Sequence, residues 1–156
     1  MKKILIAADY DPTAKKVAEK GLELAKSMNA EVVLLHVVSN IAYYSTLEAS
    51  PIMGFNEFNY TDFTQIIDVD GVKKAAQYYL DKLKNHLGDE AIQTVIEEGE
   101  SAETILSTAK KLHADLIVMG THSRRWLEQI LVGSETEKVL NLTTIPLYVV
   151  PTKGHK

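Results

Sequence analysis

The sequence predicts a doubly wound α/β fold, in which a parallel sheet of five strands carries helices on both faces. Two observations predict it. Short apolar runs alternate along the 156-residue chain with longer stretches in which apolar residues recur every three or four positions, and the run at residues 32–38 is apolar on both faces. Strands that alternate with helices imply right-handed crossovers and a parallel sheet. A run with two apolar faces is typical of a central strand that helices cover.

The first half of the chain predicts two strands with a helix between them. The apolar run at residues 4–8 forms the first strand, and Asp11 and Pro12 follow it as a capping residue and a first helical residue. Small and apolar residues then recur with helical spacing as far as Met28, where the first helix ends. Residues 32–38 form the second strand.

Residues 39–69 depart from this pattern, because they show no sustained period. Loops of that length are usually functional, and this one carries many large apolar side chains. We expect a flap that packs on its own domain or, alternatively, on a ligand or a partner subunit. A second helix begins near Gly71 and ends near Gly88.

The second half predicts three strands that alternate with two helices. In chain order the strands cover residues 92–98, 116–119 and 147–150, and the helices run from about 101 to 112 and from 135 to 142. Ser101 is expected to cap the first of these helices. Pro146 and Pro151 bracket the last strand, which suits an edge position in the sheet.

Length and composition bound the function. A chain of this size predicts one domain over residues 1–156, since domains average roughly 150 residues. The net charge of -4 excludes nucleic acid and anionic membranes as natural partners, so any anion site must be local. There is no cysteine, which excludes disulfides and thiolate catalysis. The apolar run near the N-terminus is too short for a signal peptide or a membrane span, so we expect a cytoplasmic protein.

The most informative stretch is residues 119–134, which leaves a strand at Gly120 and reaches a helix start at Gly133 and Ser134. Backbone N–H groups at a helix start, with glycines that let a ligand approach, are what a phosphate site requires. The same residues also fit a protein without a ligand, in which Gly120 only ends a strand and Ser134 forms a capping box with Glu137. Spacing alone leaves both interpretations open.

Gly120, Ser123 and the pair Gly133 and Ser134 resemble the G-x2-G-x9-G-S/T nucleotide-binding motif of the universal stress protein family, with Ser123 in place of the second glycine. The resemblance extends through residues 3–9, 33–37, 99–105, 114–120 and 145–150. It implies a strand order of 3-2-1-4-5 and a homodimer that pairs through the C-terminal strand at residues 146–150. It also implies bound ATP, or AMP or ADP, with magnesium as a candidate companion ion.

We therefore predict a nucleotide site at the carboxyl ends of the strands. Its predicted residues are Ala8, Asp9, Val37, Met119, Gly120, His122, Ser123, Arg124, Gly133, Ser134, Glu135 and Thr136. The resemblance puts Asp9 and Val37 beside the adenine and ribose, and a carboxylate and an apolar wall suit those groups. The glycines and serines of the motif would hold the ribose and phosphates, and the start of the last helix would add backbone contacts.

Two further residues carry expectations. Asp11 stands where related sequences often have serine, so it either joins Asp9 in holding a metal ion or repels phosphate. His36, on a central strand, is expected to be a buried and hydrogen-bonded histidine rather than a ligand.

No residue set is built for turnover, because neither a Walker lysine nor a pair of nucleophile and base is evident. We expect a regulatory or structural ligand, with slow hydrolysis at most. The alternative is a nucleotide-free dimeric module that acts through its dimer surface and the aromatic-rich loop. A third hypothesis, an enzyme of the wider adenine-nucleotide α-hydrolase group, has only the fold to support it.

Overall fold

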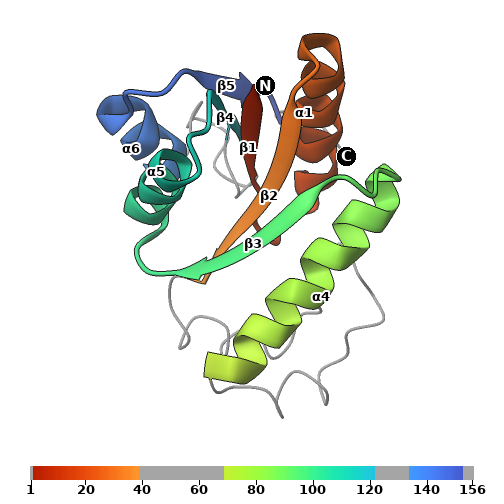
Figure 1. Cartoon of the computed structure of the whole chain (residues 1–156). Coiled ribbons are helices and arrows are strands. Elements are labelled where there is room, and N and C mark those ends of the chain that lie inside the picture. The colour runs from red at the N-terminus through yellow and green to blue at the C-terminus, as the bar shows by residue number, and fades with distance from the viewer. Residues whose placement is uncertain (1, 39–68, 122–133, 153–156) are drawn as a thin grey trace.

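A computed structural model of the chain describes residues 2–38, 69–121 and 134–152. These residues form a five-stranded sheet in the order β3-β2-β1-β4-β5, in which every neighbouring pair is parallel (Figure 1). The strands are β1 (Lys3–Ala7), β2 (Glu31–Val38), β3 (Gln93–Glu98), β4 (Leu116–Gly120) and β5 (Leu147–Val150). The predicted fold class, strand order and edge position of the last strand are confirmed.

Helices cover both faces of this sheet, as predicted. In chain order they are α1 (Ala14–Met28), α4 (Val69–Leu87), α5 (Ser101–Lys111) and α6 (Ser134–Leu142). Figure 1 shows α1 and α4 on one face and α5 and α6 on the other. None of these helices is long and apolar enough to cross a membrane.

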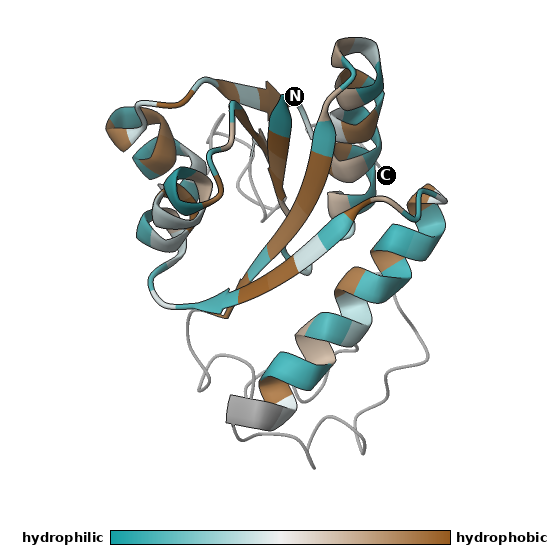
Figure 2. Ribbon diagram, in the orientation of Figure 1, coloured by the Kyte–Doolittle hydropathy of each residue, from teal (hydrophilic) through white to brown (hydrophobic). Residues whose placement is uncertain are grey.

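The alternation of side chains along β1 divides the core into two halves. Ile4 and Ile6 pack with α1 and α4, whereas Leu5 packs with α5 and α6, and all three side chains are fully buried. Figure 2 shows the corresponding pattern, with hydrophobic strands in the centre and hydrophilic residues on the outer sides of the helices. The two-faced apolar character of the central strands therefore has the predicted cause.

The predicted strands agree with the observed ones to within one residue, but the starts and caps of the helices differ from the prediction. Regular helix α1 begins at Ala14, and the Asp11 carboxylate instead caps the turn before it, accepting from the Thr13 N–H at 2.9 Å and the Thr13 hydroxyl at 2.6 Å. The N-cap of α5 is Glu100 and not Ser101, which is the first helical residue. The Glu100 carboxylate accepts from backbone N–H groups of the first turn, so its longer side chain does what was expected of the serine.

The long loop predicted at residues 39–69 lies outside the described residues, apart from Val69. That residue is the first of α4, so the helix begins two residues before the expected Gly71.

Candidate functional site

The order of the strands puts the switch point of the sheet between the ends of β1 and β4. From β1 the chain proceeds to β2 and β3 on one side, and it then returns to place β4 on the other side of β1. Ligands of doubly wound sheets bind at such a switch point, beyond the carboxyl ends of the strands. The structure brings the predicted residues Ala8, Asp9, Val37, Met119 and Gly120 together along this edge of the sheet.

The predicted residues on the strand ends differ in how far their side chains are accessible to a ligand. The side chains of Ala8 and Met119 are buried in the core, so only their backbone can face a ligand. Asp9 and Val37 are half-buried. Among the predicted residues on these strand ends, a carboxylate and an apolar side chain therefore remain partly accessible.

The loop after β1 is organised by its own carboxylates. Asp9 accepts from the N–H of Asp11 through Oδ1 at 3.0 Å, and Asp11 Oδ1 in turn holds Thr13. Asp11 is buried and its Oδ1 is engaged within the loop, which gives it a structural role beside the two predicted alternatives of metal ligand and phosphate repulsion. Within the described ranges, no three His, Asp or Glu side chains are grouped to hold a metal ion.

The end of β4 is tied to the segments that follow it. A Cβ atom on Gly120 would lie 3.0 Å from Val17 Cγ2 and 3.2 Å from Thr152 Cγ2, so this glycine allows close packing. The Gly120 carbonyl accepts from the Thr136 hydroxyl at 2.9 Å, which holds the first turn of α6 beside β4. The hydroxyl groups of Thr121 and Thr152 form a hydrogen bond with an O···O distance of 2.8 Å. The glycine is thus explained by packing, and Thr136 by positioning of the α6 N-terminus.

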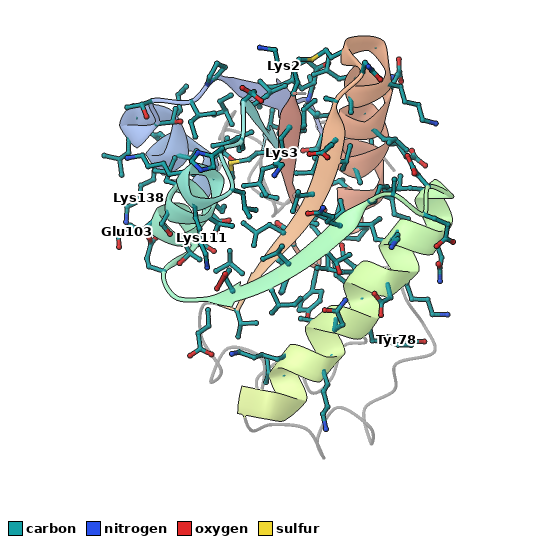
Figure 3. The ribbon with its side chains drawn as sticks, in the orientation of Figure 1. Lys2, Lys3, Tyr78, Glu103, Lys111 and Lys138 are labelled. Atoms are coloured by element: carbon teal, nitrogen blue, oxygen red, sulfur yellow. The ribbon has the colours of Figure 1, made fainter. Side chains whose placement is uncertain are left out.

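The side chain of Glu135, at the start of α6, interacts with α5. Burial raises the pKa of Glu135, a hydrogen bond from Ser101 opposes that rise, and the charge of Glu100 adds to it. Lys138 lies 3.3 Å from Glu100 and 3.9 Å from Glu103, and Figure 3 shows Lys138 and Glu103 together on the outer side of the two helices. Any contact from Glu135 to an anion at this helix start would therefore come from its backbone.

Part of the predicted site lies outside the described residues. His122, Ser123, Arg124 and Gly133 fall between β4 and α6 in that segment, and Ser134 is the first residue of α6. The described part of the site thus holds the residues expected beside the base and ribose, together with Gly120 and the start of α6.

A buried aromatic cluster lies under the loop after β1. His36 is 3% exposed, and its Nδ1 donates to the Ala8 carbonyl at 2.7 Å, so the expectation of a satisfied buried histidine is confirmed. Burial lowers the pKa of His36 to about 4, although the hydrogen bond to Ala8 acts in the opposite direction. The rings of Tyr10 and Tyr79 complete the cluster, with centroids 4.9 Å apart.

Tyr79 was not singled out by the sequence, which shows it only as one more residue of an apolar helical stripe. Its hydroxyl donates to the Asp9 carbonyl. Burial raises the pKa of Tyr79, and the negative charge of Asp9 raises it further, so the phenol stays protonated and can donate. The presence of a hydroxyl group within an otherwise apolar helical stripe indicates a buried hydrogen bond, but it does not identify the acceptor.

The fold and the strand-end residues define a doubly wound α/β protein with a half-buried carboxylate, that of Asp9, at its switch point. The family model described as "Universal stress protein family" matches residues 1–151, and the chain belongs to that family. It is 30% identical to the universal stress protein MJ0577 of Methanocaldococcus jannaschii, over 98% of this chain and 96% of that protein. It is 29% identical to the universal stress protein YxiE of Bacillus subtilis, over 95% and 97% of the two chains.

Solved structures share the architecture. The structure of MJ0577 superposes with a TM-score of 0.72 at 28% identity, covering 98% of this chain and 97% of that one. UspA from Lactobacillus plantarum gives a TM-score of 0.71 at 21% identity, covering 96% and 97%, which is a likeness of fold.

Proposed function

We propose that this universal stress protein binds an adenine nucleotide, ATP or its AMP or ADP counterpart, as a regulatory or structural ligand in a stress-associated role. The observation that carries the proposal is the half-buried Asp9 carboxylate at the switch point, with Val37 on the neighbouring strand end. A carboxylate accepts from ribose hydroxyls, and a valine side chain offers an apolar surface to a purine. The single domain and the cytoplasmic location predicted from the sequence remain part of this proposal.

The α6 N-terminus supports a place for the phosphates. Thr136 holds the first turn of this helix against the end of β4, so the N–H groups of that turn lie at the same edge of the sheet as Asp9. We propose that Gly133, Ser134 and the backbone of Glu135 and Thr136 hold the phosphates, together with His122, Ser123 and Arg124. Any magnesium would enter with the phosphates, because this metal is commonly bound through phosphates and one or two carboxylates.

The architecture itself can hold such a ligand. One structural neighbour is a universal stress protein in complex with cAMP, with a TM-score of 0.61. At 14% identity the likeness is one of fold alone, so it supports a fold that accommodates an adenine nucleotide and does not locate the site in this chain.

Calorimetric titration with ATP and magnesium tests the proposal. We expect saturable heat with the wild-type protein and weaker binding after Asp9→Asn, which removes the charge but keeps the size of the side chain. Asp81→Asn is the matched control, because Asp81 is exposed on α4 and accepts from Gln77, as an asparagine oxygen also can. Absence of heat and of any thermal shift at millimolar nucleotide would reject nucleotide binding and favour the nucleotide-free module.

We further propose a homodimer that pairs through residues 146–150. β5 is the last strand in the sheet order, and its four residues, Leu147–Val150, include no charge. Proteins normally protect such an edge with charged residues, a bulge or a covering element. Tyr148 is 41% exposed at this edge, and it lines a groove of about 390 Å³ between α1 and β5 together with charged residues of α1 such as Lys16, Lys20 and Glu23.

The orientation of the β5 backbone provides a sharp test. The carbonyls of Pro146 and Val150 accept from β4, so by the two-residue period of a strand Leu147 and Val149 present their backbone groups to the open edge. Val149→Pro removes an outward N–H and spares the ladder to β4. Sedimentation should show a dimer for the wild type and for Val149→Ala, and a monomer for Val149→Pro. A monomeric wild type at all concentrations would reject the dimer.

A further inference from the structure

We infer that Tyr79 and His36 are positioning residues of the proposed nucleotide site, which fix the backbone of Ala8 and Asp9 and thereby aim the Asp9 carboxylate. The inference rests on the proposed function and extends it to α4, a helix that supplies none of the predicted ligand contacts.

The contact from α4 is direct. Tyr79 is 2% exposed, and its hydroxyl donates to the backbone carbonyl of Asp9, seventy positions earlier in the chain. The side chain of the same aspartate accepts from the Asp11 N–H at 3.0 Å. Asp9 is therefore held at its carbonyl by α4 and at its carboxylate by its own loop, which fixes the direction in which the remaining lone pairs of that carboxylate point.

The contact from β2 holds the preceding residue. His36 Nδ1 donates to the Ala8 carbonyl at 2.7 Å, and the Ala8 N–H donates to the Leu35 carbonyl at 2.8 Å. Two successive carbonyls, of Ala8 and Asp9, are thus bound by side chains from two other elements. The path of the chain as it leaves β1 is set by these donors and not by the sheet ladder alone.

The space between the donors is filled by a ring. The Tyr10 centroid lies 4.5 Å from that of His36 and 4.9 Å from that of Tyr79. Hydrogen bonds in such a dry surrounding are stronger than in water, and a loop backed by packed rings has little freedom to move. Binding at Asp9 and docking of α4 should therefore stabilise each other, as linkage requires.

The adjacent residue on α4 provides a matched control. Tyr78 is 37% exposed, with Lys82 Nζ 5.4 Å from its ring centroid, and Figure 3 shows it on the outer side of the helix. Tyr78→Phe and Tyr79→Phe make the same chemical change at neighbouring positions. Only the second removes a donor to Asp9, and both keep the ring that packs.

A double-mutant cycle on ATP affinity tests the positioning role. Tyr79→Phe should weaken ATP binding about five- to tenfold, the worth of one hydrogen bond, and Tyr78→Phe less than twofold. In an Asp9→Asn background Tyr79→Phe should cost less than twofold, because the group that it aims has been altered. An equal loss in both backgrounds, which a merely structural role predicts, overturns the inference, and so does no loss at all.

Hydrogen exchange without nucleotide separates this inference from the proposed function. The amide of Asp11 reports the loop, and it should exchange about tenfold faster in Tyr79→Phe and in His36→Leu than in the wild type or Tyr78→Phe. His36→Asn, which can still donate near the position of Nδ1, should restore much of the protection. If the wild type binds no adenine nucleotide, the proposed function is rejected. If the Asp11 amide of Tyr79→Phe also exchanges at the wild-type rate, the anchoring of the loop by Tyr79 is overturned as well.

Discussion

At the scale of the single residue, the neutral state of His36 makes the stability of the protein depend on pH. The imidazole has a pKa of about 4 in the folded protein, because burial disfavours its charge, whereas an unfolded histidine titrates near 6.5. Below about pH 6.5 the unfolded chain therefore binds a proton that the folded protein refuses. The free energy of unfolding falls as the pH falls through this window, and the loss saturates below about pH 4.

We expect the free energy of unfolding to drop by about 2 kcal/mol between pH 7 and pH 5 on account of His36. Urea denaturation at the two pH values measures it. In His36→Asn, which cannot titrate, this part of the slope should disappear while the contributions of the carboxylates stay. A slope that is the same in the variant as in the wild type would contradict the pKa assigned to His36.

The single residue is also where sequence reasoning reached its limit. His36 was predicted to be buried and satisfied because it interrupts an apolar strand, and that context is visible in the sequence. The hydrogen-bond partner of Tyr79 could not be predicted, because a helical stripe shows which side of the helix faces the core but not which backbone carbonyl lies opposite a given side chain. For Asp11 the sequence predicts a metal ligand or a repulsive charge, and the structure adds a local partner that was not predicted, because the Asp11 carboxylate accepts hydrogen bonds from Thr13 two residues on.

At the scale of the element, the contact of α1 with β1 depends on a missing side chain. A Cβ atom on Gly21 would lie 2.5 Å from Ile6 Cδ1 and 2.9 Å from Ile6 Cγ1, so a larger residue there would force the buried Ile6 side chain or the helix to shift. Alanine improves helix propensity by about 1 kcal/mol, while overpacking of a filled core costs about 1–3 kcal/mol. The steric cost should win.

Gly21→Ala should therefore lower the free energy of unfolding by about 1 kcal/mol, against its helix propensity. In an Ile6→Val background, which removes the atom at 2.5 Å, the same substitution should cost less. Denaturant unfolding of the four proteins measures this coupling. Additive effects would show that the crowding at Ile6 is not the cause.

The start of α5 gives a second test at this scale. The Glu100 carboxylate accepts from the N–H groups of Ala102 at 3.3 Å and Glu103 at 2.8 Å, and the second of these bonds is the main cause of the lowered pKa of Glu100. Glu100→Ala should reduce stability by about 1 kcal/mol, the usual worth of an N-cap. Glu100→Gln keeps an acceptor and should lose less, as thermal unfolding would reveal; equal losses would assign the effect to charge instead.

The N-cap of α5, which is Glu100 and not the expected Ser101, shows why the ends of helices are harder to predict than the helices themselves. Glu100 and Ser101 are adjacent, and both can accept from a helix N-terminus, so propensity favoured the shorter side chain. The structure differs because Ser101 already has helical geometry and its hydroxyl bonds to Glu135 of α6, a tertiary contact that no local pattern contains. The strands were predicted to within one residue, because continuous apolar runs bounded by polar residues leave little choice of register.

At the scale of the whole molecule, the alternation of strands and helices fixed the sheet class, and the resemblance to a family supplied the order of the strands. The order determines which loops meet. Asp9 and Gly120 are more than a hundred positions apart, and they lie at one edge because β1 and β4 are neighbours. Half of the predicted phosphate segment lies outside the described residues, so its part in binding stays a prediction.

The proposed dimer makes a last prediction about the whole molecule. If β5 pairs with its copy, the outward amides of Leu147 and Val149 gain hydrogen bonds only in the dimer, whereas the amide of Tyr148 faces β4 in monomer and dimer alike. Raising the protein concentration should therefore slow hydrogen exchange at Leu147 and Val149 and leave Tyr148 nearly unchanged. Equal slowing at all three amides would instead indicate global stabilisation, and exchange independent of concentration across the dimer transition would place the contact elsewhere.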